Sequence, residues 1–111
     1  MIDQIRPGGL KAWMQAQSGA TVVLDVREPW ELEVAGLQPQ GFELVTIPMN
    51  EVPARLGELD PDRPVACLCH HGTRSQRVAM YLVSNGFGQV ANIAGGIDAW
   101  SLERDAAVPR Y

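Results

Sequence analysis

Short apolar runs alternate along the chain with stretches in which apolar residues recur at helical spacing. β-Branched and aliphatic residues dominate residues 21–26, 44–47 and 65–69, and a shorter run occupies residues 90–93. These runs lack the apolar–polar alternation of a half-exposed strand, which is typical of parallel strands buried on both faces. They predict four strands, and residues 3–6 are a candidate edge strand.

Helical signals fall between the predicted strands. Pro29 lies early in one of these stretches, where a helix tolerates proline, and Gly86 follows another as a left-handed cap. The predicted helices cover residues 10–17, 28–34, 52–59, 73–85 and 97–104. Because strands and helices alternate with short connections, we predict one α/β domain over residues 1–111. Its central sheet is expected to be mainly parallel, with about five strands and with helices on both faces.

The composition is that of an ordinary globular domain. The chain has 111 residues, of which 46% are hydrophobic and 20% charged, so one domain with a sizeable core is expected. A net charge of −4 lacks the positive field typical of nucleic-acid binding proteins. The apolar runs are too short to span a bilayer, and the first ten residues contain no apolar signal core. We therefore expect a cytoplasmic protein that binds neither nucleic acid nor membrane.

The two cysteines, Cys67 and Cys69, lie two positions apart at the end of a predicted strand. On an extended chain this spacing is badly placed for a disulfide, so we expect free thiols that are reduced or reactive. Cys67 lies inside the strand and is interpreted as a small buried hydrophobic residue. His70 and His71 follow at once, but four ligands within five residues cannot easily surround one ion. No metal site is therefore predicted.

Three groups of residues follow directly after predicted strands. Arg27 follows the first clear strand, residues 69–75 follow the third, and Gly95 with Gly96 follows the fourth. In open parallel sheets, ligands bind beyond the carboxyl ends of the strands, which share one edge. We therefore expect these residues to converge.

The segment from residue 69 to residue 75 carries the clearest chemistry. A short loop from a strand to a helix directs backbone N–H groups inward and forms an anion-binding nest that stabilises a thiolate. Gly72 permits the tight path, and Arg74 adds a positive charge. Ser75 is a candidate hydrogen-bond donor to the sulfur or a helix cap. This pattern favours nucleophilic attack by Cys69 on an electrophile carried by an anion.

Three motifs together resemble the single-domain rhodaneses, a family of sulfurtransferases. Their order and spacing match the family, and together they cover nearly the whole chain. They read Leu24-Asp25-Val26-Arg27-Glu28 with Trp30-Glu31, Cys69-x-x-Gly72-x-Arg74-Ser75, and Gly95-Gly96-Ile97-x-Ala99-Trp100.

The resemblance implies a rhodanese-like fold and a double-displacement reaction. The Cys69 thiolate would accept sulfane sulfur from thiosulfate or another small anionic donor, hold it as a persulfide, and pass it to an acceptor thiol, protein thiols included, or to cyanide. Neither a metal nor an organic cofactor is implied. The expected substrate-binding residues are Arg27, His70, His71, Gly72, Thr73, Arg74 and Ser75.

Some roles have two interpretations at this point. Arg27 is either part of the scaffold or a positive lining of the pocket, and Asp25 is interpreted as scaffold. His70 and His71 are either exposed loop residues or groups at the pocket mouth. Gly95 and Gly96 are interpreted as residues where the backbone approaches the site closely.

Other functions are compatible with the same fold. A thiol phosphatase or an arsenate reductase is one alternative, although Cys69 to Arg74 spans six residues and the related phosphatases carry one more. A non-catalytic sensing or docking module is a second, and a persulfide carrier that turns over thiosulfate poorly is a third.

Overall fold

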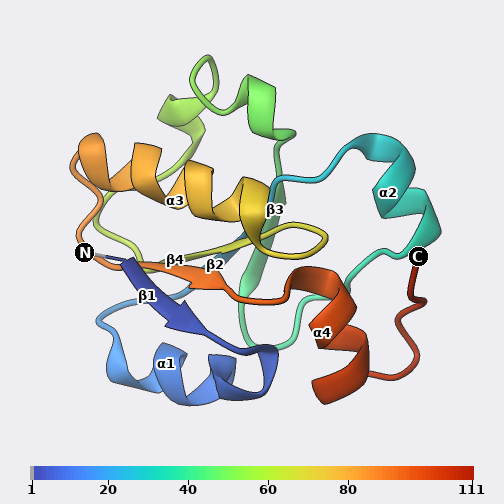
Figure 1. Cartoon of the computed structure of the whole chain (residues 1–111). Helices are drawn as coiled ribbons and strands as arrows, with labels where there is room; N and C mark the ends of the chain where they lie inside the picture. The colour runs from blue at the N-terminus through green and yellow to red at the C-terminus, as the bar shows by residue number, and fades with distance from the viewer. Residues whose placement is uncertain (1) are drawn as a thin grey trace.

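The computed structural model describes residues 2–111 and shows five parallel strands within them (Figure 1). Their order across the sheet is β1-β5-β4-β2-β3, and each neighbouring pair is parallel. The strands are β1 (Ile2–Ile5), β2 (Val22–Asp25), β3 (Glu43–Thr46), β4 (Val65–Leu68) and β5 (Val90–Ile93). The predicted α/β class with a parallel sheet is confirmed.

Within residues 2–111, four α-helices and three short 3₁₀ turns lie between the strands or after the last of them. They are η1 (Pro7–Gly9), α1 (Leu10–Ala16), α2 (Pro29–Val34), η2 (Met49–Glu51), η3 (Leu56–Glu58), α3 (Thr73–Ser84) and α4 (Gly96–Glu103). The helix predicted over residues 52–59 is wrong, because hydrogen-bonded turns occupy residues 52–55 and η3 follows them. Pro53 lacks an amide hydrogen and Gly57 is a poor helix former, so a stretch this short does not nucleate an α-helix.

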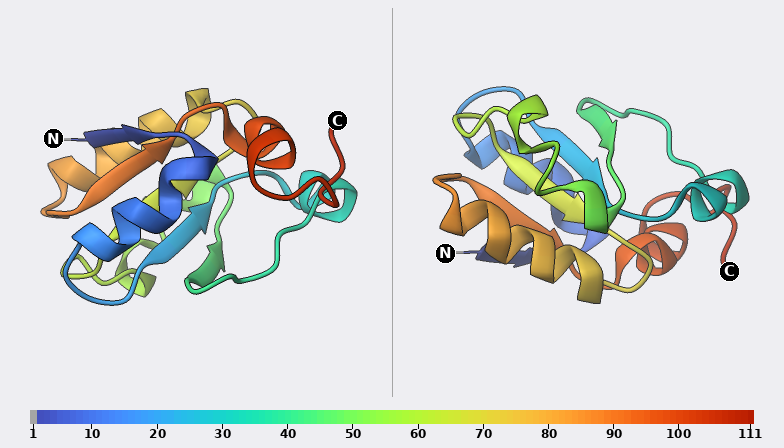
Figure 2. Two further views of the ribbon diagram at one scale, coloured as in Figure 1. Left: turned by 90° about the horizontal axis from the view of Figure 1, so that it is seen from below. Right: turned by 90° about the horizontal axis from the view of Figure 1, so that it is seen from above.

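Helices cover both faces of the sheet, as predicted (Figure 2). On one face, Val78, Ala79 and Leu82 of α3 pack against the strands. On the other face, α1 and α4 bury Trp13 and Trp100. The two apolar clusters draw on alternate residues of each central strand, because successive strand side chains point to opposite faces.

The buried strands are β2, β4 and β5, in which all four residues are buried. The run at residues 44–47 was also expected to be buried on both faces, and this is wrong. Its strand, β3, lies at the edge of the sheet with both end residues exposed and its middle residues half-buried. An apolar run does not encode where its strand stands in the sheet.

The parallel arrangement brings the carboxyl ends of β2, β4 and β5 to one edge, where the chain turns into α2, α3 and α4. The register aligns Asp25 of β2 with Leu68 of β4, so Arg27 and Cys69 both lie within two residues of the point where their strands end. Figure 1 shows the loop after β4 beside the start of α4. Within residues 2–111, no helix is long and apolar enough to cross a membrane.

Candidate active site

Cys69 lies directly after β4, at the start of the segment that we call the cysteine loop (residues 69–75). Its Sγ accepts a hydrogen bond from the Gly72 N–H at 3.1 Å, and the Ser75 Oγ lies 3.2 Å away. Gly72 has φ +107°, a left-handed conformation that strongly favours glycine. The loop therefore folds back on the sulfur and brings a backbone amide and a hydroxyl to it.

The N-terminal turn of α4 holds the cysteine loop from outside. The Ile97 N–H donates to the Cys69 carbonyl at 2.8 Å, and the Asp98 N–H donates to the His70 carbonyl at 3.2 Å. A Cβ on Gly96 would overlap both of these carbonyl oxygens. The structure thus places Gly96 where α4 and the loop approach most closely, and Gly95 precedes it with φ +83°.

Several loop amides remain available to a ligand. A peptide carbonyl and the next amide point in opposite directions, so holding the carbonyls of Cys69 and His70 against α4 turns the following amides away from α4. The amides in the first turn of α3 have no carbonyl partner within the helix, because no helical residue precedes them by four positions. In residues 2–111, the following loop amides form no hydrogen bond to the protein: His70, His71, Thr73, Arg74 and Ser75. They can bind an anion at the helix N-terminus. The Thr73 side chain itself is exposed.

Arg74 was expected to supply a free positive charge to the site. Instead, it is paired with a carboxylate. Its Nη1 and Nη2 donate to the two carboxylate oxygens of Glu31, both at 2.7 Å. The Glu31 side chain is 3% exposed. The Arg74 guanidinium lowers the pKa of Glu31 to about 2, against the opposing effect of burial. The charge of Arg74 is therefore balanced locally, and the ion pair ties the start of α3 to α2.

Arg27 is likewise committed to a carboxylate. Its Nε and Nη2 donate to the Asp25 carboxylate at 2.9 and 2.7 Å, and both side chains are buried. Of the two interpretations of Arg27, the geometry favours the scaffold, because a fully buried and paired guanidinium offers no free charge to a ligand. Asp25 also accepts the Arg27 backbone N–H and so fixes the turn after β2.

Tyr111 joins the two ion pairs, and sequence reasoning missed it. Its hydroxyl accepts a hydrogen bond from Arg27 Nη1 at 3.1 Å and donates one to Glu31 at 2.9 Å. Its ring stacks on His70 with centroids 3.9 Å apart and meets Trp30 edge-on. No local pattern marks a residue that reaches its partners from 80 positions away along the chain.

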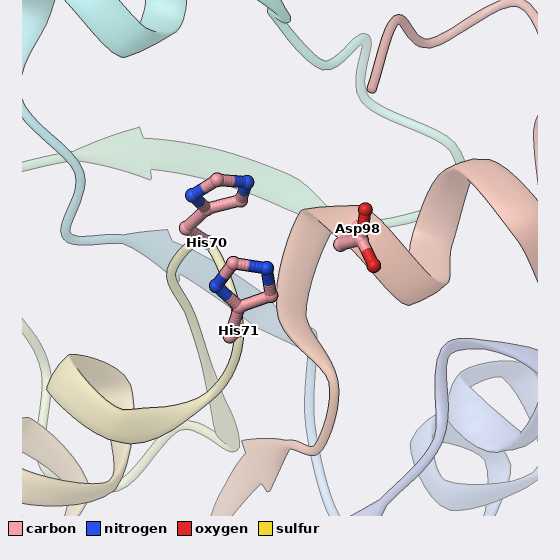
Figure 3. Close-up of side chains that lie close together, drawn as sticks. All are labelled: His70, His71 and Asp98. Carbon is pink, nitrogen blue, oxygen red and sulfur yellow. The ribbon is translucent and has the colours of Figure 1, made fainter. Parts of the chain in front are cut away.

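In the cysteine loop, His70 is half-buried and His71 is exposed, and their rings stack with 3.9 Å between centroids. Figure 3 shows the two rings beside the first turn of α4, which carries Asp98. The ligand atoms of these three residues lie within 4.8 Å of one another. However, Asp98 accepts a hydrogen bond from Arg110 Nε at 2.9 Å, and His70 also stacks on a tyrosine. Asp98 is thus already paired with an arginine, and the cluster carries no argument for a metal ion, although within residues 2–111 the buried His70 Nε2 has no hydrogen-bond partner.

Asn92 of β5 is a second residue that sequence reasoning missed. It is 4% exposed and lies beneath the cysteine loop. Its Oδ1 is 2.6 Å from the Ser75 Oγ, and its Nδ2 donates to the Gly72 carbonyl at 3.2 Å and to Gln4 Oε1 at 3.0 Å. The available signal was a single polar residue inside a short apolar strand.

Cys67 lies in the middle of β4 and is fully buried. Burial, with a smaller contribution from Cys69, raises the pKa of the Cys67 thiol far above its usual range. A neutral buried thiol is a poor nucleophile. Only the second of the two cysteines is therefore placed for chemistry.

The comparisons with known proteins agree with this geometry. The family model described as "Rhodanese-like domain" matches residues 7–103. A protein named "Sulfurtransferase" from Allochromatium vinosum is 36% identical over 101 residues, which cover 91% of this chain and 90% of that protein. A solved structure of a rhodanese-related protein from Thermoplasma volcanium shares 30% identity, covers 92% of this chain and 93% of that one, and superimposes with a TM-score of 0.73.

A longer relative shows that such a domain also occurs inside larger proteins. "Rhodanese-like/PpiC domain-containing protein 12, chloroplastic" from Arabidopsis thaliana is 41% identical over 93 residues, or 80% of this chain. The match covers only 30% of the Arabidopsis protein.

Proposed function

The chain belongs to the rhodanese-like domain family, and from that premise we propose that it is a sulfurtransferase in which Cys69 carries the transferred sulfur. The observation that carries this proposal is the set of donors around Cys69 Sγ: the Gly72 N–H donates to the sulfur, and further loop amides have no partner among residues 2–111. Backbone donors around a sulfur favour the thiolate and can bind the anionic group of a donor.

In the first half-reaction, the Cys69 thiolate attacks the outer sulfur of thiosulfate. The sulfur–sulfur bond of the donor breaks, and sulfite leaves with the bonding electron pair. The product is a Cys69 persulfide whose negative charge lies on the outer sulfur, so charge is conserved. Other sulfane donors, such as a persulfide, would react in the same way with a thiolate as the leaving group.

In the second half-reaction, an acceptor thiolate or cyanide attacks the outer sulfur of the persulfide. The Cys69 thiolate leaves and is regenerated, and the acceptor departs as a persulfide or as thiocyanate. Both steps displace a sulfur nucleophile at sulfur, with no net oxidation or reduction over the cycle. The reaction therefore requires a stabilised thiolate and hydrogen-bond donors that bind an anion.

The charges around the site bear on how the donor is bound. Arg27 and Arg74 each face a carboxylate at hydrogen-bond distance. We infer that the donor anion is held mainly by the loop amides, with His70 and His71 at the mouth. Such a site suits a compact anion that several N–H groups can reach at once.

The test is intact-mass spectrometry after incubation with thiosulfate. We expect the mass of one added sulfur atom, removed by cyanide or by a reducing thiol. The same gain is expected in Cys67→Ser and is expected to be absent in Cys69→Ser. The proposal would be overturned if the protein gained no sulfur atom from either thiosulfate or an inorganic polysulfide. Hydrolysis of an aryl phosphate without sulfur transfer would favour the phosphatase alternative instead.

A further inference from the structure

A buried amide side chain beneath the nucleophile has no part in the reaction as described so far. Asn92 is flanked in β5 by residues that face the opposite apolar cluster, so its side chain points toward α3 and the cysteine loop. A buried amide is costly unless its hydrogen bonds are satisfied, and here both ends are occupied. What the two ends contact determines what Asn92 does.

The Gly72 carbonyl fixes which way the Asn92 amide faces. This carbonyl can only accept a hydrogen bond, so the Asn92 Nδ2 must be the group that faces it at 3.2 Å. The Asn92 Oδ1 therefore faces Ser75. Because Oδ1 cannot donate, the 2.6 Å contact requires the Ser75 hydroxyl to donate its proton to Asn92.

Ser75 has one hydroxyl proton and two neighbours that can accept it. Cys69 Sγ lies 3.2 Å from the hydroxyl oxygen, and the Asn92 Oδ1 lies at the shorter distance. While the proton is on the Asn92 side, Ser75 presents only lone pairs to the sulfur. This arrangement suits a neutral Sγ and opposes a thiolate.

We propose that Asn92 is a positioning residue that draws the Ser75 hydroxyl proton away from Cys69 and so limits how readily Cys69 ionises. A thiolate gains the Ser75 hydrogen bond only by breaking the bond between Ser75 and Asn92. The Gly72 N–H remains a donor to the sulfur, and Asn92 holds it in place through the Gly72 carbonyl.

The consequence for catalysis rests on the sulfurtransferase function proposed above. In a persulfide, Sγ is a bridging sulfur without full charge, so Asn92 favours the thiol and the persulfide over the free thiolate. A thiolate with fewer hydrogen bonds is also a stronger nucleophile, because nucleophilicity falls as thiolate stability rises. Asn92 would thus keep the attacking sulfur reactive and the sulfur-loaded form stable.

The experiment measures alkylation of Cys69 by iodoacetamide between pH 5 and 9, in a Cys67→Ser background with one thiol. Four proteins form a cycle: the parent, Asn92→Leu, Ser75→Ala and the double variant. In Asn92→Leu the Ser75 hydroxyl turns to the sulfur, so the midpoint of the profile moves to lower pH and the thiolate fraction below the midpoint rises about tenfold. Ser75→Ala is expected to change the parent less than twofold, but to reverse the tenfold gain when added to Asn92→Leu.

The outcomes separate this role from a merely structural one. The proposal would be overturned if Ser75→Ala had the same effect in the parent and in Asn92→Leu. It would also be overturned if Asn92→Leu slowed alkylation equally at all pH values without moving the midpoint. If Asn92→Leu does not fold, Asn92→Ala serves instead. It also removes the acceptor opposite Ser75, so the midpoint must move to lower pH, and adding Ser75→Ala must reverse this shift. Alkylation needs no sulfur donor, so this result is independent of whether the protein forms a persulfide.

Discussion

Cys67 and Cys69 are the same residue type, belong to the same apolar cluster, and are each at most 1% exposed. The two sulfur atoms differ in the hydrogen-bonding groups around them. In the described part of the chain, the Cys67 sulfur takes part in no hydrogen bond, and its pKa is raised by burial. The Cys69 sulfur accepts a backbone amide and lies beside a hydroxyl. Burial alone therefore says nothing about which thiol reacts, and the difference comes from the polar groups that the cysteine loop brings to one of them.

The two cysteines also differ in what holds their surroundings. The environment of Cys67 is maintained by apolar packing within one strand and its neighbours. The environment of Cys69 depends on directed contacts from three separate elements: α4 through Ile97, α2 through Glu31, and β5 through Asn92. The loop should consequently be sensitive to single substitutions that leave the strand intact.

The largest expected effect comes from exchanging each cysteine for serine. Cys69→Ser should abolish sulfur transfer while the protein stays folded, because a serine hydroxyl is not ionised at neutral pH. Cys67→Ser should keep most of the activity and lose about 1–3 kcal/mol of stability from a buried hydroxyl. The measurements are sulfur transfer and urea unfolding. A folded Cys67→Ser protein without activity would reverse the assignment of the nucleophile.

Gly96→Ala tests whether the close approach of α4 shapes the environment of Cys69. A Cβ at this position would overlap the carbonyl oxygens of Cys69 and His70, so the loop must move. Sulfur transfer should fall at least tenfold, and the protein should lose more than about 2 kcal/mol of stability.

The matched control for that substitution is Gly86→Ala. Gly86 also has a left-handed φ, +90°, but a Cβ there would meet nothing within 4 Å. It should cost only the backbone strain, about 1–2 kcal/mol, with activity unchanged. Equal losses of activity in the two variants would mean that strain, and not contact with the loop, explains the effect.

The sequence predicted those parts of the site whose residues lie close together along the chain. The proposed nucleophile, Gly72 and the glycine pair could be recognised because each follows a strand at a spacing that short backbone turns require. The residues that complete the site could not be predicted in this way. Glu31 meets Arg74 across 43 positions, and Tyr111 meets Arg27 across 84. Such contacts depend on how helices and termini pack on the sheet, which no local pattern encodes.

The two errors in the fold have the same origin. The order of strands across the sheet decided that β3 is an edge strand, although its apolar run resembles those of the central strands. In residues 52–59, tertiary packing buries Val52 and Leu59 without requiring a continuous helix between them. Burial of these two residues therefore does not determine the backbone conformation that connects them.

Arg74→Ala should have a smaller effect on activity than the changes at Cys69 and Gly96. It leaves the buried Glu31 carboxylate without its guanidinium, which should cost about 1.5–3 kcal/mol of stability and roughly tenfold in kcat/KM as α3 loosens from α2. Arg77→Ala, on the exposed side of α3, should stay within about 0.5 kcal/mol of the parent.

A double variant shows whether Arg74 acts through Glu31 or through the substrate. Glu31→Gln combined with Arg74→Ala removes the unpaired charge and should recover part of the stability. It should also recover part of the activity if Arg74 mainly positions the loop. Recovered stability without any recovered activity would instead mean that Arg74 contacts the donor directly.

The last comparison concerns the response to acid, which separates the cysteine loop, held by an ion pair, from the apolar surroundings of β4. The pKa of Glu31 lies at about 2 in the folded protein because of its hydrogen bonds with Arg74, below the ordinary 4.5 of an unfolded glutamate. A carboxylate with a lowered folded pKa contributes stability above its unfolded pKa and loses it as the pH falls through the folded one. The parent should therefore lose about 3 kcal/mol between pH 5 and pH 2 from this group.

Glu31→Gln should show a correspondingly shallower decline in urea unfolding. Glu58→Gln is the control, because Glu58 pairs with Arg55 on the surface, where solvent weakens the pair. If both variants follow the parent's acid profile, the Arg74 pair is no stronger than a surface contact, and the cysteine loop must depend on α4 and β5 alone.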